Sequence, residues 1–69
     1  MNATLLRLYR DILRVHQQKL PLNHRKLGDE YVKAEFRSIK KATSPDILEM
    51  FTSNWKQYLQ ILQKQEADF

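Results

Sequence analysis

The stretch SPDILEMFTSNWKQYLQIL, from Ser44 to Leu62, decides the fold class of this 69-residue chain. Its first three residues favour a helix start, because they offer a capping hydroxyl, a proline at the first helical position and an acid near the positive end of the helix dipole. Apolar residues then recur at the three- or four-residue spacing of one helix face. These residues are Leu48, Phe51, Trp55, Tyr58, Leu59 and Leu62. We therefore predict a helix over about 45–65.

The beginning of the chain carries a second amphipathic pattern, from about residue 3 to residue 19. Asn2 or Thr4 can cap this helix, and Pro21 ends it, because a residue that precedes proline avoids the helical region. Its apolar half on a helical wheel holds Leu5, Leu8, Tyr9, Ile12, Leu13 and His16. The N-terminal stretch is rich in arginine, but Asp11 interrupts it and the apolar stripe continues to Leu20. We therefore expect it to be part of the fold rather than a removable presequence.

The middle of the chain predicts the second helix in chain order, over about 29–41, with Asp29 as its cap and Val32, Phe36 and Ile39 as its apolar stripe. The stretch 21–28 contains a proline and the single glycine of the chain, and we expect it to form a loop. Leu22 and Leu27 should then turn from this loop into the core. Three amphipathic helices with short links bury their stripes together, so residues 1–69 should form a single all-α domain, an antiparallel three-helix bundle.

The composition excludes several classes of function. A chain of this length builds a modest core, and it has no cysteine for a disulfide or a thiolate metal site. Its two histidines are too few for a structural zinc site without unusual help from carboxylates. His16 fits a core-edge residue with one satisfied nitrogen, and His24 lies in a basic stretch and should be solvated. No catalytic pair, bound metal or directly bound cofactor is expected. We expect a non-enzymatic protein, monomeric when free, that gains stability from a partner.

The charge is unevenly distributed along the chain. Residues 1–41 carry ten Lys or Arg against four Asp or Glu, a net charge of +6, whereas residues 42–69 carry two against four, a net charge of −2. Arginine pairs with carboxylates and phosphates through its planar fork, so two basic stripes on neighbouring helices predict an acidic partner surface. The predicted basic patch consists of Arg7, Arg10, Arg14, Lys33, Arg37, Lys40 and Lys41.

Two other binding functions agree with the charge. The first alternative is a small basic helical domain that binds nucleic acid, although the third helix has no basic face and no short glycine-containing turn joins two helices. The second is binding to an anionic membrane surface. A membrane span is not expected, because the chain has no run of about 20 apolar residues.

Two blocks of sequence resemble a known family. Leu8-Tyr9-Arg10, near the start of the first helix, resembles the motif of the LYR-motif family. The block LGDEYVKAEFR, from Leu27 to Arg37, followed by Lys40, is similar to one branch of that family, the succinate dehydrogenase assembly factor 3 branch. The third helix, with Phe51, Trp55 and Tyr58, is similar to the same branch, so the resemblance covers about residues 5–62.

This resemblance implies a fold, partners and a location. The family consists of three-helix bundles of the mitochondrial matrix that bind acyl carrier protein, an acidic partner whose acyl-phosphopantetheine enters between the helices. It implies that Leu27, Val32, Phe36 and Leu59 line the space for the acyl chain, and that the basic patch meets the carrier. The branch also implies a client, the iron–sulfur subunit of succinate dehydrogenase, which a chaperone of this kind helps to mature before assembly into complex II. It implies no nucleic-acid partner.

Overall fold

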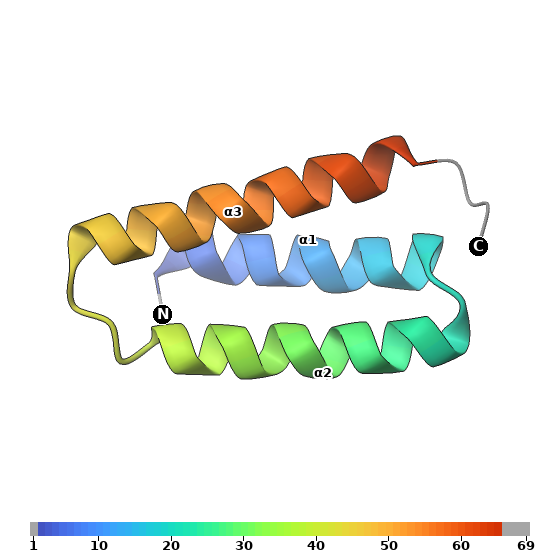
Figure 1. Ribbon diagram of the computed structural model, residues 1–69, viewed down its shortest axis with the longest axis horizontal. Coiled ribbons are helices and arrows are strands. Elements are labelled where there is room, and N and C mark those ends of the chain that lie inside the picture. The colour runs from blue at the N-terminus through green and yellow to red at the C-terminus, as the bar shows by residue number, and fades with distance from the viewer. Residues whose placement is uncertain (1, 66–69) are drawn as a thin grey trace.

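The computed structural model describes residues 2–65, which form three helices joined by short links (Figure 1). These are α1 (Ala3–Lys19), α2 (Leu22–Ile39) and α3 (Pro45–Lys64). Each helix runs antiparallel to the next along the chain, so α1 and α3 point the same way. The predicted all-α, antiparallel three-helix bundle is confirmed.

The first helix has the predicted bounds and cap. The side-chain oxygen of Asn2 accepts a hydrogen bond of 2.8 Å from the backbone N–H of Leu5, which satisfies one of the free donors at the helix start. At the other end Leu20 has extended backbone angles, φ −101° and ψ 139°, directly before Pro21. The restriction that proline places on its predecessor therefore ends α1 where the sequence predicted.

The second helix begins at Leu22, so the prediction of a loop over 21–28 and a helix start at Asp29 was wrong. Pro21 ends α1 and also occupies the capping position of α2, where a missing N–H does no harm and a fixed φ suits the helix start. Leu22 and Leu27 are 77% and 69% exposed, so the expectation that they pack in the core was also wrong. The helix ends at Ile39 rather than residue 41.

The third helix begins as predicted, with Ser44 extended at the cap and Pro45 as the first helical residue. The hydroxyl of Ser44 makes no capping hydrogen bond; its carbonyl instead accepts the N–H of Leu48 at 3.2 Å. The helix ends at Lys64, one residue before the predicted end. Within residues 2–65, no helix is both long and apolar enough to span a bilayer.

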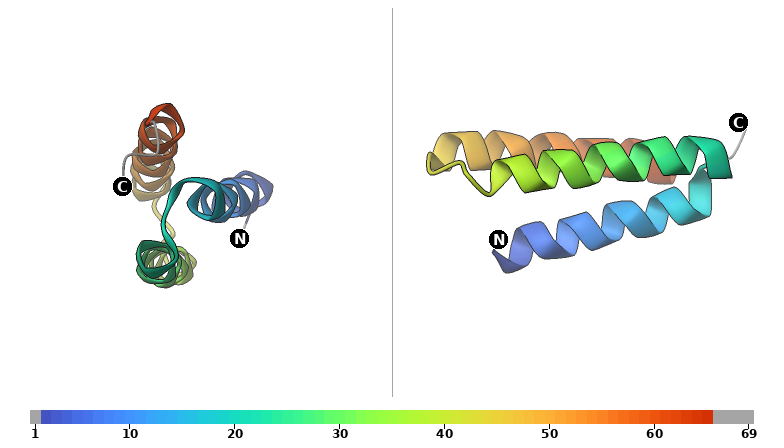
Figure 2. Two further views of the ribbon diagram at one scale, coloured as in Figure 1. Left: turned by 90° about the vertical axis from the view of Figure 1, so that its right-hand side faces the viewer. Right: turned by 90° about the horizontal axis from the view of Figure 1, so that it is seen from below.

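The core forms where α1 lies against both other helices. The left view of Figure 2 looks along the helices and shows α1 on one side of the α2–α3 pair. The backbones of α2 and α3 approach each other less closely than either approaches α1. Aromatic rings fill the wider seam between them. The Phe36 side chain, 1% exposed, lies with its ring centroid 4.8 Å from that of Phe51 and 5.7 Å from that of Trp55. Buried aliphatic residues complete the core: Leu5, Leu8, Ile12 and Val32.

Candidate partner-binding site

A cluster of polar side chains joins the three helices inside the bundle. His16 of α1 is fully buried, and its two ring nitrogens lie 2.8 Å from Oδ1 of Asp29 on α2 and 2.6 Å from the hydroxyl of Tyr58 on α3. A carboxylate only accepts, so Nδ1 donates to Asp29, and Nε2 is hydrogen-bonded to the Tyr58 hydroxyl. Arg25 adds an ion pair to the other Asp29 oxygen at 3.6 Å. We call His16, Asp29 and Tyr58 the polar clamp.

The polar clamp corrects two predictions from the sequence. His16 lies in the core rather than at its edge, and both of its nitrogens are bonded. Asp29 is an interior residue of α2 rather than its cap. A histidine on an apolar stripe was the one signal that a buried polar contact exists, since a buried imidazole must find partners. Its partners lie 13 and 42 residues away along the chain, beyond the reach of any local pattern.

The glycine of α2 makes room for the clamp. A Cβ at Gly28 would lie 3.1 Å from Cε1 and 3.3 Å from Nδ1 of His16, closer than ordinary van der Waals contact. Glycine in a helix interior costs about 1 kcal/mol relative to alanine. The glycine that seemed to mark a loop therefore marks the place where α2 approaches an α1 side chain.

The same surroundings raise the pKa of the Tyr58 phenol above its ordinary value of 10.0, first through burial and second through the negative charge of Asp29. The Tyr58 phenol therefore stays protonated in the neutral range, and its hydroxyl remains hydrogen-bonded to Nε2 of His16. The clamp is closed between helices, with His16 without solvent exposure, so its evident role is to hold the three helices in register.

The three residues of the LYR motif point in different directions from α1. Leu8 is buried in the core, and Tyr9 is half-buried with its ring centroid 5.2 Å from that of Phe36. Arg10 is exposed. The motif therefore connects the core to the surface on the side of α1 that faces α2.

A groove with an apolar floor and a basic rim runs between α1 and α2. We call it the α1–α2 groove; it has a volume of about 320 Å³. Its lining consists of Leu6, Tyr9, Lys33, Phe36, Arg37 and Lys40. Phe36 belongs to both the lining and the buried core, so this ring separates the groove from the interior of the bundle. The groove offers an apolar surface and cations to the same ligand, and no carboxylate belongs to its lining.

All seven residues of the predicted basic patch are exposed, but packing divides them. Lys33, Arg37 and Lys40 meet at the α1–α2 groove. Arg7 lies on the other side of α1, in a hollow that Lys56 of α3 also lines. Arg10, Arg14 and Lys41 are exposed but do not belong to the groove lining, and Arg14 lies 3.8 Å from the carboxylate of Asp11.

The residues that the resemblance assigned to the acyl chain are also divided. Val32 and Phe36 are core residues at 1% exposure, and Leu59 packs half-buried against the same core. Leu27 is exposed on the surface, because it lies in a helix and not in a loop that turns inward. Val32, Phe36 and Leu59 therefore belong to one core, and Leu27 lies apart from them.

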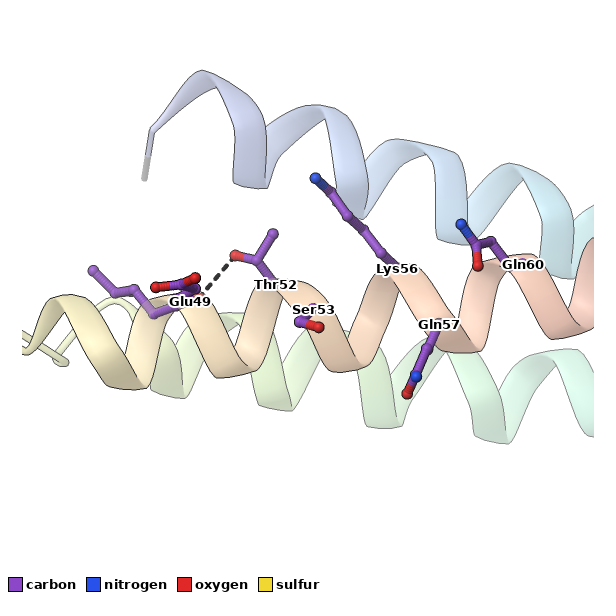
Figure 3. Close-up of a pocket in the computed structure, with 7 residues that line it drawn as sticks. Glu49, Thr52, Ser53, Lys56, Gln57 and Gln60 are labelled. Carbon is purple, nitrogen blue, oxygen red and sulfur yellow. Dashed lines mark hydrogen bonds between the residues drawn. The ribbon is translucent and has the colours of Figure 1, made fainter.

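A surface hollow of about 540 Å³ lies on α3, and most of its lining residues are polar (Figure 3). Its labelled side chains point away from one helix in different directions and do not converge on a point. The hydroxyl of Thr52 donates a hydrogen bond of 2.8 Å to the backbone carbonyl of Leu48. Glu49 and Lys56 are its charged residues, two helical turns apart. Acid–base catalysis needs groups that act on one atom, which this arrangement does not provide. No group of potential metal ligands occurs among residues 2–65.

Comparison with known proteins identifies the family. The Complex1_LYR-like family matches residues 5–68. A protein of Schizosaccharomyces pombe named succinate dehydrogenase assembly factor 3, mitochondrial, is 47% identical over 60 residues, which cover 87% of this chain and 52% of that protein. A Candida albicans protein of the same name is 50% identical over 54 residues, covering 78% of this chain and 44% of its own length.

A third relative with this name, from Gibberella zeae, is 49% identical over 53 residues, which cover 77% of this chain and 41% of the relative. The chain thus spans about half the length of these relatives or less. No solved structure matches it significantly. The family match spans most of the chain, includes the LYR tripeptide and agrees with the three-helix fold. On these grounds the chain belongs to the Complex1_LYR-like family.

Proposed function

We propose that this chain is a mitochondrial assembly factor for succinate dehydrogenase that acts by binding proteins and catalyses no reaction. The names of its relatives support this proposal, since each is called a mitochondrial succinate dehydrogenase assembly factor. The proposed location is the mitochondrial matrix. The proposed client is the iron–sulfur subunit of succinate dehydrogenase, which the chain holds during maturation. Because the chain has no cysteine, its contribution is to hold the protein rather than to ligate a cluster through thiolates.

The observation that carries the proposal is the α1–α2 groove, which we assign to acyl carrier protein. Such a carrier presents an acidic surface and an acyl chain on a phosphopantetheine. Lys33, Arg37 and Lys40 suit the carboxylates and the phosphate, because cations on a groove rim attract anions and orient them. Leu6 and Tyr9 provide an apolar floor for the acyl chain. Movement of the Phe36 ring would open a path from this floor to the core beside Val32 and Leu59.

The decisive experiment is co-expression with an acyl carrier protein followed by native mass spectrometry. We expect a 1:1 complex whose mass includes the acyl chain, and we expect Arg10→Glu with Arg37→Glu to remove it while the helix content stays unchanged. Lys56→Glu with Lys64→Glu is the matched control, because the two substitutions make the same total charge change at exposed positions of α3. Equal binding by the double variant, measured by calorimetry, would reject the assignment of the groove.

A nucleic-acid complex is the competing function. The described part of α3 carries only Lys56 and Lys64 as basic residues, and the basic groove has an apolar floor that a phosphate backbone does not need. Nucleic-acid affinity falls steeply with salt, by about one logarithmic unit per tenfold change in salt for each phosphate contacted. Carrier binding through an acyl chain depends on chain length as well as on salt. The two dependences separate the two functions.

A further inference from the structure

Within residues 2–65, one side of the α2–α3 pair is covered by no other helix. The left view of Figure 2 shows α1 on one side of the pair and no described helix on the other. Two adjoining hollows lie on the uncovered side and share Asn54. The first, of about 320 Å³, lies between the helices and is lined by Tyr31, Glu35, Phe51, Asn54, Trp55 and Tyr58. The second, of about 410 Å³, continues along α3 past Met50. We call this surface the α2–α3 face.

The α2–α3 face exposes large apolar side chains. Tyr31 is 61% exposed although its ring lies 6.1 Å from that of Trp55, and Met50 is 65% exposed. Ile47 precedes Met50 by three residues and is 53% exposed. Ile61 follows Asn54 by seven residues and is 59% exposed. These helical spacings place both isoleucines on the same stripe of α3 as Met50 and Asn54. Contiguous exposed apolar surface on a small protein marks an interaction site.

The charges of this face identify its occupant. The two hollows are lined by the carboxylates of Glu35, Asp46 and Glu49 and by no lysine or arginine. The α1–α2 groove has the opposite composition, with three cations and no acid. An apolar surface edged by carboxylates complements a segment with an apolar stripe flanked by lysine or arginine. A second copy of the same face would bring like charges together, and an anionic membrane or an acidic carrier would be repelled.

We propose that the α2–α3 face docks a basic amphipathic helix of a partner protein. An apolar side chain of that helix enters the hollow beside Tyr31 and Trp55, and its cations pair with Glu35 on α2 and Glu49 on α3. This interaction goes beyond the proposed function, because it needs no carrier and uses the opposite side of α2. Lys33 and Arg37 face α1, whereas Tyr31 and Glu35 face α3, so both sites can be filled at once.

The test uses a synthetic 18-residue helical peptide of leucine and lysine at amphipathic spacing, and a second peptide with glutamate in place of lysine. The protein has a net charge of +4, so the lysine peptide is repelled everywhere except at an acidic surface. We expect the lysine peptide to shift the NMR signals of the Trp55 indole, Tyr31 and Met50, and the glutamate peptide to leave them unchanged. Shifts centred on the α1–α2 groove, or equal shifts with both peptides, would overturn the proposal.

Two lysine substitutions supply a matched pair for calorimetry. Met50→Lys places a cation on the α2–α3 face, whereas Leu22→Lys makes the same kind of change at a residue that is 77% exposed and belongs to neither hollow. We expect Met50→Lys to weaken binding of the lysine peptide by roughly tenfold and Leu22→Lys to leave it unchanged. Equal affinities would refute the site. Self-association of the wild type by sedimentation, or its binding to anionic vesicles through Trp55, would replace the proposed occupant by another.

Discussion

Replacing Gly28 with alanine tests whether the polar clamp is as rigid as its geometry indicates. In an ordinary helix interior this change stabilises by about 1 kcal/mol, because alanine has the higher helix propensity. Here the new methyl group would lie 3.1 Å from Cε1 of His16 and 3.3 Å from its Nδ1. The imidazole cannot yield freely, because it is fully buried and bonded at both nitrogens.

The magnitude follows from the two opposing effects. Overpacking in a filled site costs about 1–3 kcal/mol, and loosening a buried hydrogen bond adds about 1 kcal/mol. After the gain in helix propensity of about 1 kcal/mol is subtracted, Gly28→Ala should lower the free energy of unfolding by about 1–3 kcal/mol. A core of this size supplies about 3–5 kcal/mol in total, so the loss is readily measured.

The effect of Gly28→Ala on the free energy of unfolding should reverse in sign when His16 is removed. In a His16→Ala background the nearest remaining atom is Cδ1 of Leu20, at an ordinary van der Waals distance of 3.5 Å, and Gly28→Ala should then stabilise by up to about 1 kcal/mol. The assay is urea unfolding of all four proteins, followed by circular dichroism, with the same osmolyte in every sample to keep the weaker variants folded. Stabilisation by Gly28→Ala in the presence of His16 would show that the imidazole moves aside and that the clamp is not rigid.

Three further outcomes are expected. Phe36→Ala should lower the free energy of unfolding by about 3–5 kcal/mol, since the ring is 1% exposed at the centre of the core; a melting temperature near wild type would contradict this packing. Folding raises the pKa of Tyr58, so the contribution of this phenol to stability is fully present below the unfolded pKa near 10.0 and is lost as the pH rises through the folded value. Absorbance at 295 nm follows the ionisation of tyrosine, and unfolding experiments between pH 9 and about 12 follow the decrease in stability. Tyr58→Phe should remove this pH-dependent decrease. Acylated carrier at about 100 times its Kd should stabilise the fold by about 2.7 kcal/mol, and an unchanged melting temperature would argue against binding to the folded state alone.

Local patterns predicted the parts of the fold that depend on neighbouring residues. The bounds of α1 and the start of α3 followed from Asn2, Pro21 and the Ser44-Pro45 pair, because caps and proline restrictions act within one turn. The start of α2 did not follow. Pro21 and Gly28 both read as helix breakers, yet the first begins a helix and the second lies inside one. Whether a glycine interrupts a helix or admits a neighbouring side chain depends on what packs beside it.

The candidate sites show the same division. The sequence predicted that the basic residues are exposed, and all seven are. It did not predict that Lys33, Arg37 and Lys40 would share a groove while Arg7 lies elsewhere, because that depends on which sides of α1 and α2 face each other. The sequence likewise did not predict the acidic and apolar character of the α2–α3 face, because the residues of this face come from two helices that are separated along the chain.

Local sequence patterns established that the chain has three amphipathic helices, that its fold is all-α and that it belongs to the family, because helical periodicity and motifs are properties of short stretches of chain. Tertiary structure alone decided that His16 meets Asp29 and Tyr58, and that one side of α2 is basic while the other is acidic and apolar. The physical reason is that packing brings together residues distant in sequence, and a helical wheel describes one helix without its neighbours.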